Sequence, residues 1–124
     1  MEGVKIVLST EKSLELFHDA LCNGLNYINS YGISVDWNND EFKAAKSKLK
    51  TPCLEDILIQ VLKDGNVINF AGEDGTTDVT LEMVLERIPK VELDTLLTMI
   101  QEQGDALTAD NIIQTVVYGE VIYG

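Results

Sequence analysis

The sequence predicts a single α+β domain that is mainly helical, with about six helices and a small sheet or hairpin of three or four strands. Three observations support this prediction. One long stretch has a clear helical period, several short β-branched segments are bounded by glycine or polar residues, and the composition is that of an ordinary globular protein, with 45% hydrophobic and 24% charged residues. No internal repeat or low-complexity linker divides the 124 residues, so we expect one domain over 1–124.

The longest periodic stretch runs from Ser13 to Gly32 and predicts the central helix. Its large apolar residues recur at steps of three and four, which places them on one face of a helix: Leu14, Phe17, Leu21, Leu25 and Ile28. Ser9 or Thr10 is expected to cap the helix, and Gly32 suits a left-handed position at its end. Gly24 lies on the inner face, which predicts either a close crossing by another backbone or a locally weak helix.

Short β-branched segments predict the strands. Val4–Leu8 is expected to form a first strand, and Ile33–Val35 a short extended segment after the long helix. Val67–Ala71 and Thr76–Val79 flank the turn Gly72–Gly75, so together they predict a β-hairpin.

The remaining helices are predicted from apolar periodicity and from the residues that begin or end them. We expect helices over Glu41–Lys50, capped by Asn39 or Asp40, over Pro52–Lys63, from Thr80 to Ile88, over Val91–Gln103, and from Thr108 to Gly119 or on to Tyr123. The apolar tail Glu120–Tyr123 needs cover, which we expect from a strand pairing with Val4–Leu8 or from a partner chain.

The charge of the chain is strongly uneven. The net charge is −12, with −1 over residues 1–50 and −11 over residues 51–124. Such a surface repels the phosphate backbone, so direct nucleic-acid binding is disfavoured. No apolar run approaches the roughly 18 to 20 residues of a membrane span, and no signal peptide is recognisable. Cys22 and Cys53 have no metal-like spacing, so we expect both to be reduced and largely buried, in a cytoplasmic protein.

His18 and Cys22 stand four residues apart, so they project from neighbouring turns of one helix and suit a metal site or a thiolate pair. A zinc site needs three or four ligands, and only Cys53 and carboxylates remain to complete one. A packed cysteine and a surface imidazole are therefore the preferred interpretation, and we expect no metal and no cofactor.

Three other patterns fail on their spacing. Asp36-x-Asn38-x-Asp40 matches the start of a calcium loop, but neither the required glycine nor the final glutamate follows, so helix capping is preferred. Gly72–Gly75 is a hairpin turn without the lysine of a phosphate loop. Glu82 and Glu86 are one turn apart without a matching ExxH pair, so a solvated helix face is expected.

These patterns favour a small acidic interaction protein without enzymatic activity, either self-associating or bound to another protein. The expected contact surface combines the acidic helices with the apolar tail, namely Glu82, Glu86, Tyr118, Val121, Ile122 and Tyr123. A more specific version is a nucleic-acid mimic that occupies the basic cleft of a DNA-binding or phage-defence protein.

The alternative is a small-molecule binder or a minor enzyme with a pocket between the long helix and the sheet. Tyr27, Tyr31 and Trp37 are the aromatic residues expected near such a pocket, although core packing also explains them. No pattern in the sequence identifies a catalytic residue.

Overall fold

The computed structural model describes residues 8–73, 75–101 and 105–123. Within them it contains six α-helices, one 3-10 helix and one three-stranded sheet, which confirms the mainly helical α+β prediction. The elements in chain order are α1 (Thr10–Asn29), β1 (Ser34–Asp36), α2 (Asn39–Ser47), α3 (Leu54–Lys63), β2 (Ile68–Gly72), β3 (Gly75–Val79), α4 (Leu81–Arg87), η1 (Ile88–Lys90), α5 (Leu93–Ile100) and α6 (Ala106–Tyr118).

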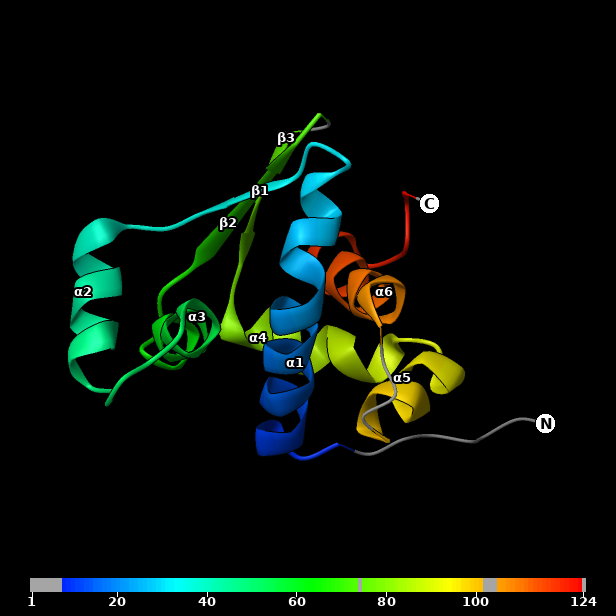
Figure 1. The fold of residues 1–124 in the computed structure, drawn as a ribbon, viewed down its shortest axis with the longest axis horizontal. Coiled ribbons are helices and arrows are strands. Elements are labelled where there is room, and N and C mark those ends of the chain that lie inside the picture. The colour runs from blue at the N-terminus through cyan, green and yellow to red at the C-terminus, as the bar shows by residue number, and fades with distance from the viewer. Residues whose placement is uncertain (1–7, 74, 102–104, 124) are drawn as a thin grey trace.

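The long helix α1 runs through the middle of the molecule. In Figure 1 the sheet, α2 and α3 lie on one side of α1, whereas α5 and α6 lie on the other. Ser9 caps the helix, because its hydroxyl oxygen accepts the amide hydrogen of Lys12 at 3.1 Å, and Gly32 takes the predicted left-handed conformation with φ +79°. The predicted apolar stripe faces the core, with Leu14, Phe17, Leu21 and Ile28 buried.

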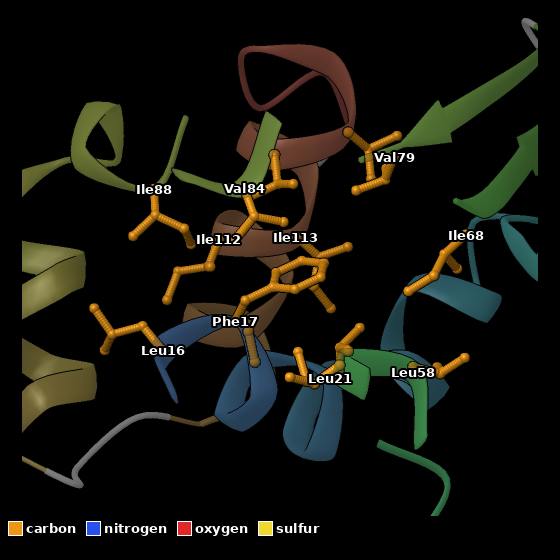
Figure 2. Close-up of a cluster of buried hydrophobic side chains, with 14 of the residues drawn as sticks. Leu16, Phe17, Leu21, Leu58, Ile68, Val79, Val84, Ile88, Ile112 and Ile113 are labelled. Carbon is orange, nitrogen blue, oxygen red and sulfur yellow. The ribbon is translucent and has the colours of Figure 1, made fainter. Parts of the chain in front are cut away.

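The closest helix crossing is between α1 and α6, at Gly24. A Cβ atom on Gly24 would lie 2.8 Å from Cδ1 of Ile113 and 3.0 Å from Cβ of Ala109. The structure therefore confirms the close crossing and explains why glycine stands inside a helix. Figure 2 shows Phe17 and Leu21 of α1 packed with Ile112 and Ile113 of α6 in the core.

The three strands are antiparallel in the order β1-β2-β3. The predicted hairpin is present, and its ladder runs from Ile68↔Val79 to Gly72↔Gly75. Leu8 lies outside any strand, and residues 4–7 of the predicted first strand lie outside the described residues.

Helix starts account for most differences from the predictions. Asn38, not Asn39 or Asp40, caps α2, because its side-chain oxygen accepts the amides of Asp40 and Glu41. The helix predicted from Pro52 begins at Leu54, since Cys53 takes the extended N-cap conformation.

The helices that follow the hairpin also differ at their ends. Pro89 interrupts the α pattern, leaving the short η1, and α5 begins only at Leu93. Asp105 caps α6, which begins at Ala106, two residues before the predicted start at Thr108. Within the described residues, no helix combines the length and apolarity needed to span a bilayer.

The C-terminal tail is neither a strand nor an extension of α6. Gly119 ends α6 with φ +83°, and residues 120–123 then fold back over that helix. The domain itself covers only part of this apolar tail, because Tyr123 packs on Tyr31 whereas Val121 and Ile122 are exposed.

Candidate functional site

Two regions of the surface gather the chemically distinctive side chains. The first lies where α1 meets the start of α3, and the second covers α5, α6 and the tail.

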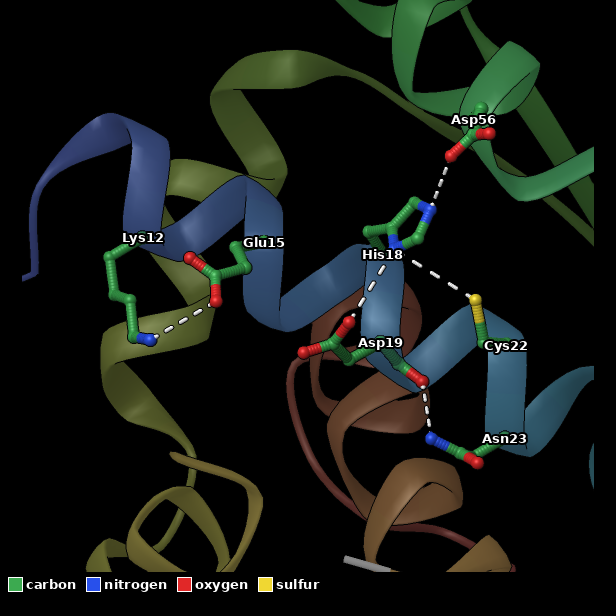
Figure 3. Close-up of polar contacts among 7 residues, drawn as sticks. All are labelled: Lys12, Glu15, His18, Asp19, Cys22, Asn23 and Asp56. Atoms are coloured by element: carbon green, nitrogen blue, oxygen red, sulfur yellow. Dashed lines mark hydrogen bonds and ion pairs between the residues drawn. The ribbon is translucent and has the colours of Figure 1, made fainter. Parts of the chain in front are cut away.

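The α1–α3 region is organised around His18. Nε2 of His18 lies 2.7 Å from Oδ1 of Asp56, and Nδ1 lies 3.5 Å from Oδ1 of Asp19 and 3.8 Å from Sγ of Cys22 (Figure 3). Asp56 is fixed in turn by the start of its own helix, because its Oδ2 accepts the amide hydrogen of Cys53 at 3.1 Å. That hydrogen bond is the main cause lowering the pKa of Asp56, and His18 lowers it further.

Both cysteines are exposed, so the prediction that they are buried is wrong. Cys22 lies on the flank of the apolar stripe, and Cys53 stands before the first turn of α3. Desolvation of the sulfur, together with the negative charges of Glu55, Cys53, Asp19 and Asp56, raises the pKa of Cys22 to about 11. The Cys22 thiol therefore stays protonated at neutral pH, which argues against an activated thiolate paired with His18.

A cavity of about 400 Å³ lies beside His18. Its wall combines apolar and charged side chains from α1, α3 and the loop before α3: Glu11, Leu14, Glu15, His18, Leu49, Lys50, Pro52, Asp56, Ile59, Gln60 and Lys63. This volume is in the range of small-molecule sites. The cavity lies between α1 and α3, which is not the predicted position between the long helix and the sheet.

The three aromatic residues predicted near a pocket do not line this cavity. Tyr27 and Tyr31 pack edge to face with centroids 5.7 Å apart, whereas Trp37 stacks on Phe42 at 5.0 Å. The aromatic site predicted from them therefore stays a prediction.

In the second region, Gln114 ties the tail to α6. Its buried side-chain oxygen accepts the amide hydrogens of Ile122 at 2.9 Å and Tyr123 at 2.8 Å. Its nitrogen donates to both carboxylate oxygens of the buried Asp110 at 2.9 Å and to the carbonyl of Tyr123 at 3.1 Å. Tyr123 also stacks on Tyr31 of the segment after α1, with ring centroids 5.5 Å apart. The end of the tail therefore packs against the domain.

Burial raises the pKa of Asp110, and the hydrogen bonds from Gln114 offset only part of this effect. Because the pKa is higher in the folded state than in the unfolded chain, ionisation of Asp110 costs stability as the pH rises from about 4 through the folded-state value. We expect the wild type to lose stability relative to Asp110→Asn as the pH rises above about 4, measured by urea unfolding. A stability difference between the two proteins that does not change with pH would contradict this.

Most of the exposed apolar side chains belong to α5, α6 and the tail. Among the described residues, five of the six exposed large hydrophobics lie between positions 93 and 122: Leu93, Leu97, Leu107, Val121 and Ile122. A groove of about 160 Å³ joins the start of α5 to α6 and to Val121 of the tail.

The predicted interface residues differ in their exposure to solvent. Val121 and Ile122 are 47% and 43% exposed, whereas Tyr118 packs edge to face on Tyr123. Glu82 and Glu86 are exposed on α4, and Glu86 pairs with Lys90 at 3.4 Å.

In the calcium-like pattern Asp36-x-Asn38-x-Asp40, side chains accept hydrogen bonds from nearby backbone amides. Asp36 accepts the amide of Trp37, and Asn38 caps α2, so two of the three side chains act in local turns.

Sequence reasoning missed Asp56, Asp110 and Gln114. Asp56 stands three residues after Cys53 at a helix start, a capping-box spacing that would have connected these two residues. Its contact with His18 spans 38 positions and has no local signal. Comparisons with family models, curated proteins and solved structures find no match for this chain.

Proposed function

We propose that the protein is a non-enzymatic interaction domain, which binds a basic protein partner through the surface formed by α5, α6 and the tail. We call this the α5–α6 surface; its exposed apolar residues are Leu93, Leu97, Leu107, Val121 and Ile122. The observation that carries the proposal is that the same stretch of chain contains these exposed apolar side chains and acidic residues without any basic residue.

Residues 91–124 carry acidic side chains but no basic ones. No lysine, arginine or histidine follows Lys90, while residues 91–124 contain six acidic residues. Arg87 already donates to the carbonyls of Val116 and Val117 at the end of α6, at 2.8 and 3.1 Å. A second copy of the same acidic face would be repelled, so the complementary partner carries basic residues around an apolar centre.

The proposal is tested by cross-linking carboxylates to lysines in the cells that encode the chain. Leu97→Asp is expected to weaken partner binding about thirtyfold, since truncating a central interface residue typically costs about 2 kcal/mol. The matched control is Leu54→Asp on α3, because Leu54 is 38% exposed and Leu97 is 41% exposed.

We expect cross-links from Glu92, Asp94 or Glu120 to one basic protein, present with Leu54→Asp and lost with Leu97→Asp. Cross-links that survive Leu97→Asp, or that fall on Asp36 and Asp40, would contradict the proposal.

A second candidate function is small-molecule binding in the cavity beside His18, favoured by its 400 Å³ volume and its mixed apolar and charged wall. Native mass spectrometry on gently purified protein tests it through ligand mass retained by the wild type. Ile59→Trp, which would fill the cavity, is expected to abolish that added mass. Wild-type protein without any added mass would count against this function.

A further inference from the structure

The fold brings three different metal-binding side chains together from two helices. His18 projects from α1, Cys53 is the N-cap residue of α3, and Asp56 lies in the first turn of α3. A ring nitrogen of His18, the sulfur of Cys53 and a carboxylate oxygen of Asp56 all lie within 4.8 Å of one another.

Two of these ligands are already oriented by their surroundings. The amide hydrogen of Cys53 holds Oδ2 of Asp56, which leaves Oδ1 facing Nε2 of His18 at 2.7 Å. On the other edge of the ring, Nδ1 faces Asp19 at 3.5 Å. A carboxylate behind the second ring nitrogen is the common arrangement that fixes the tautomer of a metal-binding histidine.

Binding a tetrahedral ion needs two movements, because Nε2 of His18 and Oδ1 of Asp56 are 2.7 Å apart and must separate by about half an ångström, while the three ligand atoms lie within 4.8 Å and Cys53 must approach. Zinc binds nitrogen, oxygen and sulfur ligands at about 2.0 to 2.3 Å, so ligand atoms in such a site lie about 3.3 to 3.8 Å apart. Cys53 is exposed, so its side chain is free to rotate and bring the sulfur about 1 Å closer to the other two ligand atoms. A mixed nitrogen, sulfur and oxygen set favours Zn²⁺ over the hard cations Ca²⁺ and Mg²⁺, which take oxygen ligands.

The carboxylates around His18 have little positive charge to balance them. Over residues 8–73, 75–101 and 105–123, the ion pairs of Asp19 and Asp56 are both with His18, and neither involves a lysine or arginine. A divalent cation would supply the missing charge.

We propose that His18, Cys53 and Asp56 bind one Zn²⁺ ion through Nε2, a thiolate and a carboxylate oxygen. The ion replaces the proton between Nε2 and Oδ1 of Asp56, the imidazole keeps one proton on Nδ1, which faces Asp19, and the thiol proton is released to solvent. Three protein ligands leave the fourth position for water or for an external ligand. His18 and Asp56 also line the 400 Å³ cavity, so an external ligand has room there. The site does not depend on partner binding at the α5–α6 surface.

Cys22 provides a matched control because it lies on the wrong side of the histidine ring. Its sulfur is 3.8 Å from Nδ1, whereas Asp56 faces Nε2, and Figure 3 shows the two on opposite edges of the imidazole. The same Cys→Ser substitution, made at Cys53 and at Cys22, therefore distinguishes a metal ligand from a cysteine that only lies nearby.

The test is a titration of the reduced full chain with Co²⁺, followed by displacement with Zn²⁺. We expect one equivalent of Co²⁺ to give the visible absorption of a tetrahedral ion and a thiolate charge-transfer band. Cys53→Ser, His18→Ala and Asp56→Asn should each weaken Zn²⁺ binding by at least about 100-fold, and Asp19→Asn by about tenfold. Cys22→Ser should keep the stoichiometry and the charge-transfer band.

Circular dichroism and urea unfolding without metal establish that each variant is folded. Asp56→Asn keeps a carbonyl oxygen to accept the Cys53 amide, so it removes the charge while preserving the cap. Loss of the charge-transfer band with Cys22→Ser, its persistence with Cys53→Ser, or no tetrahedral Co²⁺ spectrum in the wild type would each overturn the proposal.

Discussion

Replacing Gln114 by leucine is expected to lower the free energy of unfolding by about 4 kcal/mol, because it breaks a buried network that includes a carboxylate. Gln114 accepts two amide hydrogens of the tail and donates to Asp110 and to the carbonyl of Tyr123. Leucine fills a similar volume but leaves Asp110 buried without its partner. Equilibrium unfolding in urea measures the loss.

The chain offers a matched control for this substitution in Gln60. Its side chain also donates to an aspartate one helical turn away, Asp64, at 2.9 Å, but Gln60 is only partly buried. Gln60→Leu should cost less than about 1 kcal/mol. We also expect faster hydrogen exchange at Ile122 and Tyr123 in Gln114→Leu; unchanged exchange there, or equal costs for the two variants, would contradict the role of Gln114.

Replacing Gly24 by valine is expected to destabilise the protein by about 3 kcal/mol, since α1 and α6 have no room for a side chain at their crossing. The added Cβ would lie 2.8 Å from Ile113 and 3.0 Å from Ala109, and also 3.3 Å from the backbone carbon of Ala109. The end of Ile113 can rotate away, but the backbone of Ala109 can only shift with the helix. Urea unfolding again gives the measurement.

Asn26→Val is the control, because Asn26 is exposed on the same helix and tests only the helix propensity of valine. It should cost less than about 1 kcal/mol. The double variant Gly24→Val, Ile113→Ala should be less destabilised than the separate costs predict, because the removed side chain makes room. Strictly additive costs would mean that the clash is not at this crossing.

Local signals predicted most of the fold. The apolar period from Leu14 to Ile28 was sufficient to place α1, and Gly24 indicated a close crossing as one of two alternatives without identifying α6 as the helix that crosses there. The predicted helix boundaries were wrong where neighbouring residues can each begin a helix, as at the start of α3, which begins at Leu54 and not at Pro52. The tail does not form the predicted strand, because its backbone is held by Gln114, a residue that looks like any surface glutamine in sequence; its cover by a partner chain stays a prediction.

The candidate sites depended more heavily on contacts between distant residues. The sequence identified His18, Cys22 and Cys53 as possible ligands, but the spacing rules favoured Cys22, four residues from His18. The fold instead brings Asp56 to Nε2, over 38 positions. Net charge, by contrast, is additive along the chain, so the acidic character of the C-terminal part was visible without a structure.

The most direct test of the interaction proposal is native mass spectrometry of the complex purified from the cells that encode the chain. We expect one copy of this protein bound to a more basic protein, with the complex lost in Leu97→Asp and retained in Leu54→Asp. A wild-type monomer without any bound protein, or a homo-oligomer unaffected by Leu97→Asp, would contradict it.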